Sequence, residues 1–433
     1  MNPSIKSAAI QRSFQQFATV LAIAAACSSA VLAAESGAAS ANDQYKQALY
    51  LRETGQPYAA IESLEALLAS SPTLNRARLE LAVAYYRTLD YANARQQAQK
   101  VLNDPKTPES VRLSVASFLK QLELEEATVF GKPHRWDFNV SAGLLHDSNV
   151  NAGPDNALLP NGLTLSDASL KRADTGVTVN MGATHTWTRA TPVRLGDSPA
   201  RFSWVTQANA YQKTYAEANQ HNLTVMTLAT GPALQLASGH RGNLNVQADY
   251  LRLGSDWLGM FSTITPSFTW KLGRGELTAD VQWSRHAFQR SADQGRNGEY
   301  RAASLSYGHV LSQMPLTYQV GITGFQESTQ DWQFGNRGHE LFAGLRYRAW
   351  EGGDLFLREA YRQSRYVDET PTFDVRRRDN ELRSEIGASH RFSSGLMDKW
   401  QLACTVSHTH NGSNIAMYEF DRTVTSITLG KEF

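Results

Sequence analysis

The 433-residue chain carries 42 lysines and arginines against 41 aspartates and glutamates, a formal net charge of +1 at pH 7. This balance gives no electrostatic case for nucleic-acid binding, and none of the RNA-binding or zinc-finger spacings occurs in the sequence. Hydrophobic residues make up 42% of the chain, and no run of about 18 apolar residues follows position 34, which excludes transmembrane helices but not membrane-spanning strands.

The first 34 residues have the layout of a secretory signal peptide. Two basic residues precede a short apolar core, Phe17–Ala26, and small residues through Ala33 and Ala34 follow it. This three-part order predicts cleavage after Ala33 or Ala34. The apolar core is too short to span a bilayer as a helix, so we expect the chain to be exported from the cytoplasm.

Only two cysteines are present, and Cys27 lies inside the expected signal peptide. The exported chain would therefore keep Cys404 as its one thiol and could form no internal disulfide, even in an oxidising compartment. Lipidation of Cys27 is the alternative to cleavage at the small residues. Ala24 stands where lipidation signals usually carry Leu, which favours simple cleavage.

Residues 41–126 are predicted to be helical and repetitive. A spacing of 33 residues relates Tyr58 to Tyr91, Leu68 to Val101, and Pro72 to Pro105. This period is close to that of the tetratricopeptide repeat, about 34 residues, in which two antiparallel helices form each unit. Ala94 is small enough for the helices to approach closely, and Tyr58, Tyr85 and Tyr91 fill the space between them. A plain helical hairpin without a binding role is the alternative, because fewer than three full repeats are visible.

Residues 127–135 are expected to form a linker, since Gly131 and Pro133 stop the helices. From Trp136 onward the period of hydrophobic residues changes from 3.6 to 2. Similar alternating stretches recur through residues 136–433, about fourteen in all, and each is long enough to cross a bilayer at a tilt of about 45°. The pattern predicts an antiparallel transmembrane β-barrel of about fourteen strands.

The connections between these stretches alternate in length. Gly273–Gly275 and Glu351–Gly353 are turn-like, whereas Asp147–Lys171 and Val367–Asp379 read as longer polar loops. Short turns at one end and long loops at the other are typical of bacterial outer-membrane barrels. The pattern places the N-terminal helical domain in the periplasm and the first long loop outside the cell.

A soluble β-sandwich is the competing architecture for the strand region. Against it, aromatic residues cluster towards strand ends, as in the interfacial girdles of membrane barrels. The strand interiors also carry charges that a dry core could not accommodate but a water-filled lumen can. We therefore expect a set of arginines on alternating strand positions to line the lumen: Arg346, Arg348, Arg358, Arg362 and Arg383.

Local enzymatic motifs are missing, including GxxxxGK[ST], GxSxG, HExxH and CxxC, so we expect neither catalysis nor a bound cofactor. His408 and His410 share one face of a strand and could bind a metal, although polar residues at a strand end are the simpler interpretation. Four loop side chains could offer oxygens to calcium, with hydrogen-bonded turns as the alternative: Asp147, Asn149, Asn151 and Asp155. We assign no metal site.

Two features suggest partners in the cell envelope. Phe433 ends the final strand, and a terminal aromatic strand resembles the signal read by the barrel assembly machinery. Arg376, Arg377 and Arg378 end an expected extracellular loop and could contact lipopolysaccharide phosphates, for which Arg is a bidentate partner. A solvated charge run is the alternative interpretation.

The strand region resembles the surface lipoprotein assembly modulator (Slam) family of Gram-negative bacteria. The resemblance rests on GLLHDSNVNAGP, Gly143–Pro154, and on SNIAMYEFDRTVTSITLGKEF, Ser413–Phe433, with its Tyr-x-x-Asp-Arg. It implies periplasmic tetratricopeptide repeats, a fourteen-stranded outer-membrane barrel, and a role in moving surface lipoproteins or related secreted proteins to the cell surface. The repeat region here is shorter than in the better-known members of that family.

The sequence therefore predicts a non-enzymatic outer-membrane translocator or assembly factor whose partners are protein cargo, the barrel assembly machinery, outer-membrane lipids and lipopolysaccharide. Two alternatives stay open. A porin-like solute channel needs only the polar lumen, and a polysaccharide exporter likewise places repeats before a barrel.

Overall fold

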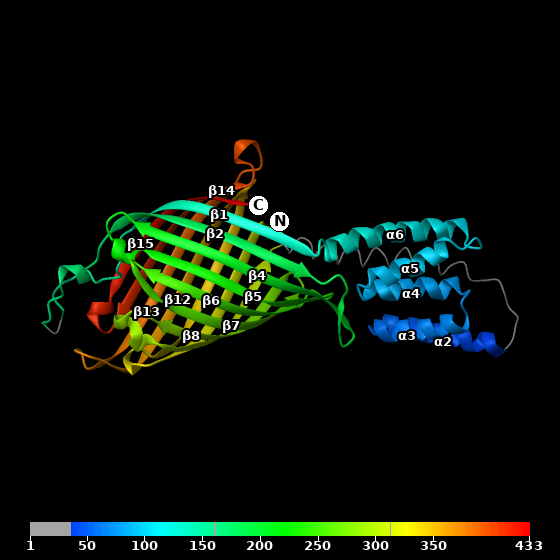
Figure 1. Ribbon diagram of the computed structural model, residues 1–433, viewed down its shortest axis with the longest axis horizontal. Coiled ribbons are helices and arrows are strands. Elements are labelled where there is room, and N and C mark those ends of the chain that lie inside the picture. Colours follow the sequence, from blue (N-terminus) through cyan, green and yellow to red (C-terminus); the bar gives the residue numbers. More distant parts are fainter. Residues whose placement is uncertain (1–35, 160–161, 312) are drawn as a thin grey trace. The chain divides into compact units, whose positions relative to one another are not determined.

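The computed structural model describes residues 36–159, 162–311 and 313–433, which form a helical unit and a β-barrel (Figure 1). The expected signal peptide, with Cys27, Ala33 and Ala34, lies outside the described residues. Among the residues described, no helix is long and apolar enough to cross a membrane.

The described residues of the helical unit form five helices: α2 (Ser36–Glu53), α3 (Pro57–Ser70), α4 (Asn75–Arg87), α5 (Tyr91–Leu102) and α6 (Glu109–Val129). Local sequence sets their boundaries. Gly55, at φ +84°, reverses the chain between α2 and α3, and Pro57 starts α3 at a position that needs no backbone donor. The Asp90 side chain caps α5 by accepting a hydrogen bond from the Asn93 amide at 3.2 Å.

The helices bury two apolar clusters that share Tyr85. The first lies among α2, α3 and α4, around Leu64, Leu67 and Leu81, and Tyr58 packs against it. The second lies among α4, α5 and α6, and there Tyr91 is 3% exposed and Ala94 is fully buried. Of the residues related by the 33-residue spacing, Tyr58, Leu68, Tyr91 and Val101 therefore lie in or against the cores, whereas Pro72 and Pro105 are exposed.

Helix α6 ends later than the expected boundary at residue 126. It continues to Val129, because no residue that disfavours a helix occurs before Gly131, which adopts φ +56°, and Pro133. The first strand begins at His134, so the connection is four residues long, 130–133, and shorter than the expected linker 127–135.

Fourteen long strands of the described residues form a closed antiparallel barrel, which confirms the expected strand number and pairing. The strands are β1 (His134–Asp147), β2 (Asp174–Thr188), β4 (Ser198–Tyr215), β5 (Leu223–Leu236), β6 (Arg241–Leu253), β7 (Asp256–Leu272), β8 (Gly275–Phe288), β9 (Gly298–Val310), β10 (Leu316–Thr329), β11 (Asn336–Trp350), β12 (Gly353–Thr370), β13 (Val375–Arg391), β14 (Trp400–Ser413) and β15 (Phe420–Glu432). The short β3 (Val193–Leu195) pairs only with β4.

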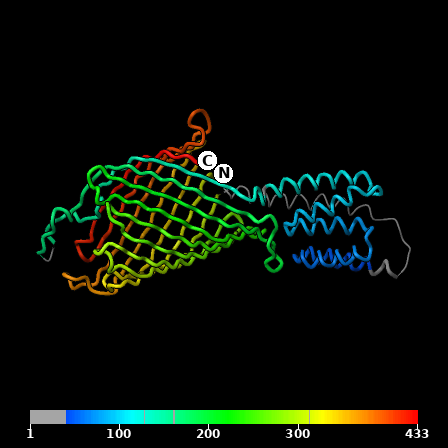
Figure 2. The backbone as a smooth tube through the Cα atoms, in the orientation of Figure 1, coloured from blue at the N-terminus to red at the C-terminus, as the bar shows by residue number. Residues whose placement is uncertain are grey.

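Two strand pairings close the barrel. Each long strand pairs with the next long strand along the chain, with β2 pairing with β4 across the short β3. β1 pairs with β15 through nine residue pairs, from Asn139–Glu432 to Asp147–Val424. Figure 2 shows the first and last strands lying next to each other. Closure leaves no long unpaired strand edge in the described part of the barrel. A β-structure needs such closure in order to exist within a lipid bilayer.

The alternation of side chains along each strand gives the barrel two chemically different faces. On β1, Trp136, Phe138 and Leu144 are exposed on the outer face, whereas Leu145 and Asp147 are buried on the inner face. The register places Leu144 beside Val177 of β2 and Ile427 of β15, both also exposed and apolar. A closed barrel with a continuous apolar exterior is a membrane-spanning barrel.

The connections at the two ends differ less in length than expected. At the end called here the loop end, one connection is long, 148–173, but β6 and β7 join there through only Gly254 and Ser255. The expected loop Val367–Asp379 is wrong, because cross-strand pairing extends β12 to Thr370 and starts β13 at Val375. At the opposite end, the turn end, two-residue turns join β7 to β8 and β11 to β12.

Candidate functional site in the barrel interior

The inner wall of β11, β12 and β13 carries a group of arginines, called here the arginine wall. Its members are the residues expected in the lumen: Arg346 and Arg348 on β11, Arg358 and Arg362 on β12, and Arg383 on β13. They alternate with the exposed apolar side chains of the outer face, such as Leu345, Leu357 and Leu382. Strand parity alone therefore places all five on the inner face.

Carboxylates on the same wall are shared between pairs of these arginines. Asp354 lies 2.7 Å from Arg346 and 3.9 Å from Arg348. In the same way, Glu340 lies 2.6 Å from Arg383 and 3.8 Å from Arg362. Glu381 also lies 3.0 Å from Arg383, so two carboxylates balance Arg383 and Arg362. Asp354 alone faces Arg346 and Arg348, which leaves a local excess of positive charge there.

The arginine wall is in contact with water. The Arg346 and Arg348 side chains are 62% and 68% exposed although they point into the barrel. Arg358, near the middle of β12, is also exposed; its guanidinium lies 5.6 Å from the Phe342 ring centre, and it has no ion pair within the described part of the chain. Exposed inward-facing arginines at two heights indicate an interior that water enters.

A buried ionic cluster lies on the inner face at the loop end. The Asp147 carboxylate accepts two hydrogen bonds from the Arg422 guanidinium, at 3.0 and 2.6 Å, across the β1–β15 seam. Tyr215 of β4 donates its hydroxyl to the same carboxylate at 2.5 Å, and the Asn149 amide donates at 3.1 Å. Lys213 lies next to this cluster, 4.9 Å from the Tyr215 ring centre.

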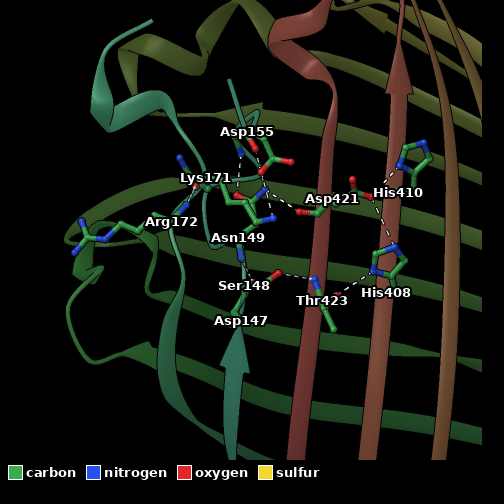
Figure 3. Close-up of polar contacts among 12 residues, drawn as sticks. Asp147, Ser148, Asn149, Asp155, Lys171, Arg172, His408, His410, Asp421 and Thr423 are labelled. Atoms are coloured by element: carbon green, nitrogen blue, oxygen red, sulfur yellow. Dashed lines mark hydrogen bonds and ion pairs between the residues drawn. The ribbon is translucent and has the colours of Figure 1, made fainter. Parts of the chain in front are cut away.

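The two segments that carry the family resemblance meet at this cluster (Figure 3). Besides the Asp147–Arg422 pair, the Asn149 side-chain amide donates to the carbonyl of Asp421 at 3.0 Å, and the Thr423 amide donates to the Ser148 hydroxyl at 2.8 Å. Residues 143–154 and 413–433 are distant in sequence but adjacent in the barrel. Sequence reasoning did not pair Asp147 with Arg422, because the contact depends on the register between β1 and β15.

The four side chains that could offer oxygens to calcium each bond to different partners within the protein. Asn149 bonds to the backbone of Gly153 in both directions, at 2.8 and 3.0 Å, and Asn151 bonds to the backbone of Leu170 and Arg172. Asp155 pairs with Lys171 at 3.2 Å (Figure 3). Bonds of this kind organise a loop on its own backbone.

His408 and His410 lie on the outer face of β14, near the loop end. Both approach the Asp421 carboxylate, His410 at 2.8 Å and His408 at 3.7 Å, and His408 also contacts the Thr423 hydroxyl at 2.9 Å (Figure 3). Within the described residues, no set of three or more His, Cys, Asp or Glu side chains is arranged to hold a metal ion.

The residues Arg376–Arg378 belong to β13 and point to different faces. Arg377 points inward, where it stacks 3.5 Å from the Tyr418 ring centre and pairs with Asp379 at 2.6 Å. Arg378 is exposed on the outer face, opposite Arg365. Phe433 is 65% exposed, and its backbone exchanges hydrogen bonds of 2.9 and 3.4 Å with Phe138 of β1.

One titratable side chain lies outside the strands beside the ionic cluster. His221 ends the short 3-10 helix η3 (Asn219–His221) between β4 and β5. Burial lowers its pKa below the usual 6.5, and the nearby positive charges of Arg172 and Lys213 lower the pKa further.

No family model matches the chain, and no curated protein matches it. Among solved structures, similar chains include the Pseudomonas aeruginosa protein OccK5 (OpdH), at 10% identity and a TM-score of 0.32, covering 69% of this chain and 98% of that one. Another is OccAB4 of Acinetobacter baumannii, at 9% identity and a TM-score of 0.33, covering 70% and 99%. A third is P. aeruginosa OpdK with vanillate, at 8% identity and a TM-score of 0.34, covering 69% and 99%. The barrel assignment stands on its strand pairings.

Proposed function

We propose that the protein forms a porin-like channel for hydrophilic solutes across the outer membrane. One observation carries this proposal: a closed barrel with an apolar exterior holds an arginine wall that is accessible to water inside it. Each such arginine on the lipid face would cost about 2–4 kcal/mol near the middle of the bilayer, so the inward placement is strongly favoured. A water-filled, charged interior is what a solute channel requires.

The charges on the wall indicate which solutes pass. Five arginines share the inner face of β11–β13 with the carboxylates Asp354, Glu340, Glu381 and Glu385 in the same part of the barrel, so positive charge is in slight excess. A lumen lined by one sign of charge concentrates counter-ions. We therefore expect a modest preference for small anions. Under this proposal the loop end faces the outside of the cell, and the helical unit is periplasmic.

The test is conductance of the full-length protein in planar lipid bilayers. Discrete current steps in potassium chloride are expected, and a salt gradient should give a reversal potential of the sign that favours chloride. Insertion as a folded barrel is checked by heat-dependent migration on gels. Folded, inserted protein that passes no current would contradict the channel proposal.

Protein translocation is the second candidate, and a specific observation favours it. The two segments that resemble the Slam family pack against each other at the loop end. Both parts of the resemblance therefore belong to a single structural site. The helical unit, with paired helices at tetratricopeptide spacing, would bind extended cargo in the periplasm. Under this second candidate function, Phe433 is the residue that the barrel assembly machinery recognises.

Removing the helices separates the two candidates. Full-length protein and a variant lacking residues 41–126 would each be expressed with a neighbouring lipoprotein or secreted gene. Translocation predicts surface cargo only with the full-length chain, while both chains insert. Equal amounts of surface cargo in both strains, and in a strain that lacks the gene for this protein, would exclude translocation and favour the solute channel.

A further inference from the structure

Three arginines form a row across neighbouring strands on the outer face near the loop end. Arg337 of β11 is the cross-strand partner of Arg365 of β12, and Arg365 is the partner of Arg378 of β13. All three side chains are exposed. This set is called here the arginine row, and it is distinct from the arginine wall inside the barrel.

The side chains beneath the row are graded from polar to apolar. The next aligned set towards the turn end is His339, Gln363 and Asn380, and the set after it is Leu341, Tyr361 and Leu382. Tyr361 and Gln363 both donate to the Asn380 side-chain oxygen, at 3.2 and 3.1 Å, which confirms that these sets share one face. The same order, from charged to polar to apolar, is found across a membrane leaflet, where the lipid headgroups lie above the apolar core.

The height of the row fits the outer edge of a membrane. At the turn end of the same face, Trp350 donates its indole N–H to His390 at 3.0 Å and marks the opposite interface. Trp350 lies thirteen positions after Arg337 on β11, which is about 43 Å along a strand and about 30 Å along the barrel axis at a tilt of about 45°. That is the thickness of a bilayer's hydrocarbon core.

The row has no counter-charge in the described part of the protein. None of its guanidinium groups has a hydrogen bond or ion pair there, and the aligned carboxylate Glu359 lies six residues below Arg365, where it accepts a bond from Ser384 at 2.6 Å. By contrast, the outward Arg301 of β9 pairs with Glu299 at 2.6 Å. Like charges placed directly opposite each other destabilise a sheet, so the row requires an external anion to offset the repulsion.

We propose that the arginine row binds the phosphate groups of the lipid A part of lipopolysaccharide in the outer leaflet. Guanidinium groups bind phosphates through paired hydrogen bonds. The row spans two interstrand spacings, about 10 Å, which suits a headgroup with more than one phosphate better than a single phosphodiester. The acyl chains would lie along the apolar layers below. This inference rests on outer-membrane placement but not on solute conduction.

The experiment measures lipid binding to the full-length protein by native mass spectrometry in detergent. The probes are diphosphorylated lipid A, lipid A stripped of its phosphates, and phosphatidylglycerol. Wild type should bind diphosphorylated lipid A at least tenfold more tightly than the stripped form. The variant Arg337→Gln/Arg365→Gln/Arg378→Gln should lose that preference, and the matched control Arg301→Gln, which removes an already paired outward charge, should keep it.

Folding of each variant is checked by heat-dependent migration, and the single variant Arg365→Gln provides a milder test if the triple variant does not assemble. The comparison of the three lipids on the wild-type protein tests the proposal without any variant. Equal binding of phosphorylated and stripped lipid A would overturn the proposal. So would equally tight binding of phosphatidylglycerol, which would assign the row to phospholipid, or an unchanged preference in a folded triple variant.

Discussion

Replacing Arg422 by Gln tests the ionic cluster at the seam between the first and last strands. The Asp147 carboxylate is fully buried, whereas the Arg422 side chain is 28% exposed to the lumen. Among the described residues, the substitution leaves the carboxylate with the Tyr215 hydroxyl and the Asn149 backbone amide as its donors. Breaking a buried pair from one side costs about 3–5 kcal/mol, and partial access of water to the arginine places the expected loss at the lower end, about 3 kcal/mol.

The matched control is Arg346→Gln, because Arg346 also bonds an inner-face aspartate, Asp354, but is 62% exposed. An exposed pair contributes at most about 1 kcal/mol. The assay is urea unfolding of the barrel in lipid vesicles, followed by tryptophan fluorescence. The double variant Asp147→Asn/Arg422→Gln should recover part of the loss, since it removes the unpaired charge. Equal losses for Arg422→Gln and Arg346→Gln would refute the reasoning.

Three further outcomes are expected. Ala94→Leu overfills the fully buried contact between α4 and α5 and should cost about 1–3 kcal/mol, seen as earlier loss of helical circular dichroism on heating while the barrel persists. Arg358→Glu reverses an unpaired lumen charge and should lower the chloride-to-potassium permeability ratio by at least about twofold, measured as reversal potential; an unchanged ratio would argue against the arginine wall as a selectivity element. His221 has a lowered pKa when folded, so its contribution to stability is present above its usual pKa of 6.5 and is lost as the pH falls through the folded value. Hydrogen exchange in residues 216–222, corrected for intrinsic rates, should therefore rise between about pH 7.5 and about pH 5, and His221→Gln should remove this change.

Much of the architecture followed from periodicity. The change from period 3.6 to period 2 after Gly131 separated helices from strands, and the count of alternating stretches led to fourteen strands, because each crossing of a bilayer needs one stretch of similar length. The expected loop Val367–Asp379 failed for the opposite reason. Its polar residues look like a loop, but they continue a hairpin whose cross-strand hydrogen bonds do not depend on side-chain polarity.

The sequence by itself determined which arginines share a face along one strand, because side-chain parity is a local property. It could not decide that Asp147 meets Arg422, or that Arg337, Arg365 and Arg378 align. Those contacts depend on the register between strands and on the closure of β1 against β15, which joins segments more than 270 residues apart. Register is set by the sum of pairings around the whole barrel, so only the tertiary structure shows which charges are neutralised inside it and which face outward without a partner in the described chain.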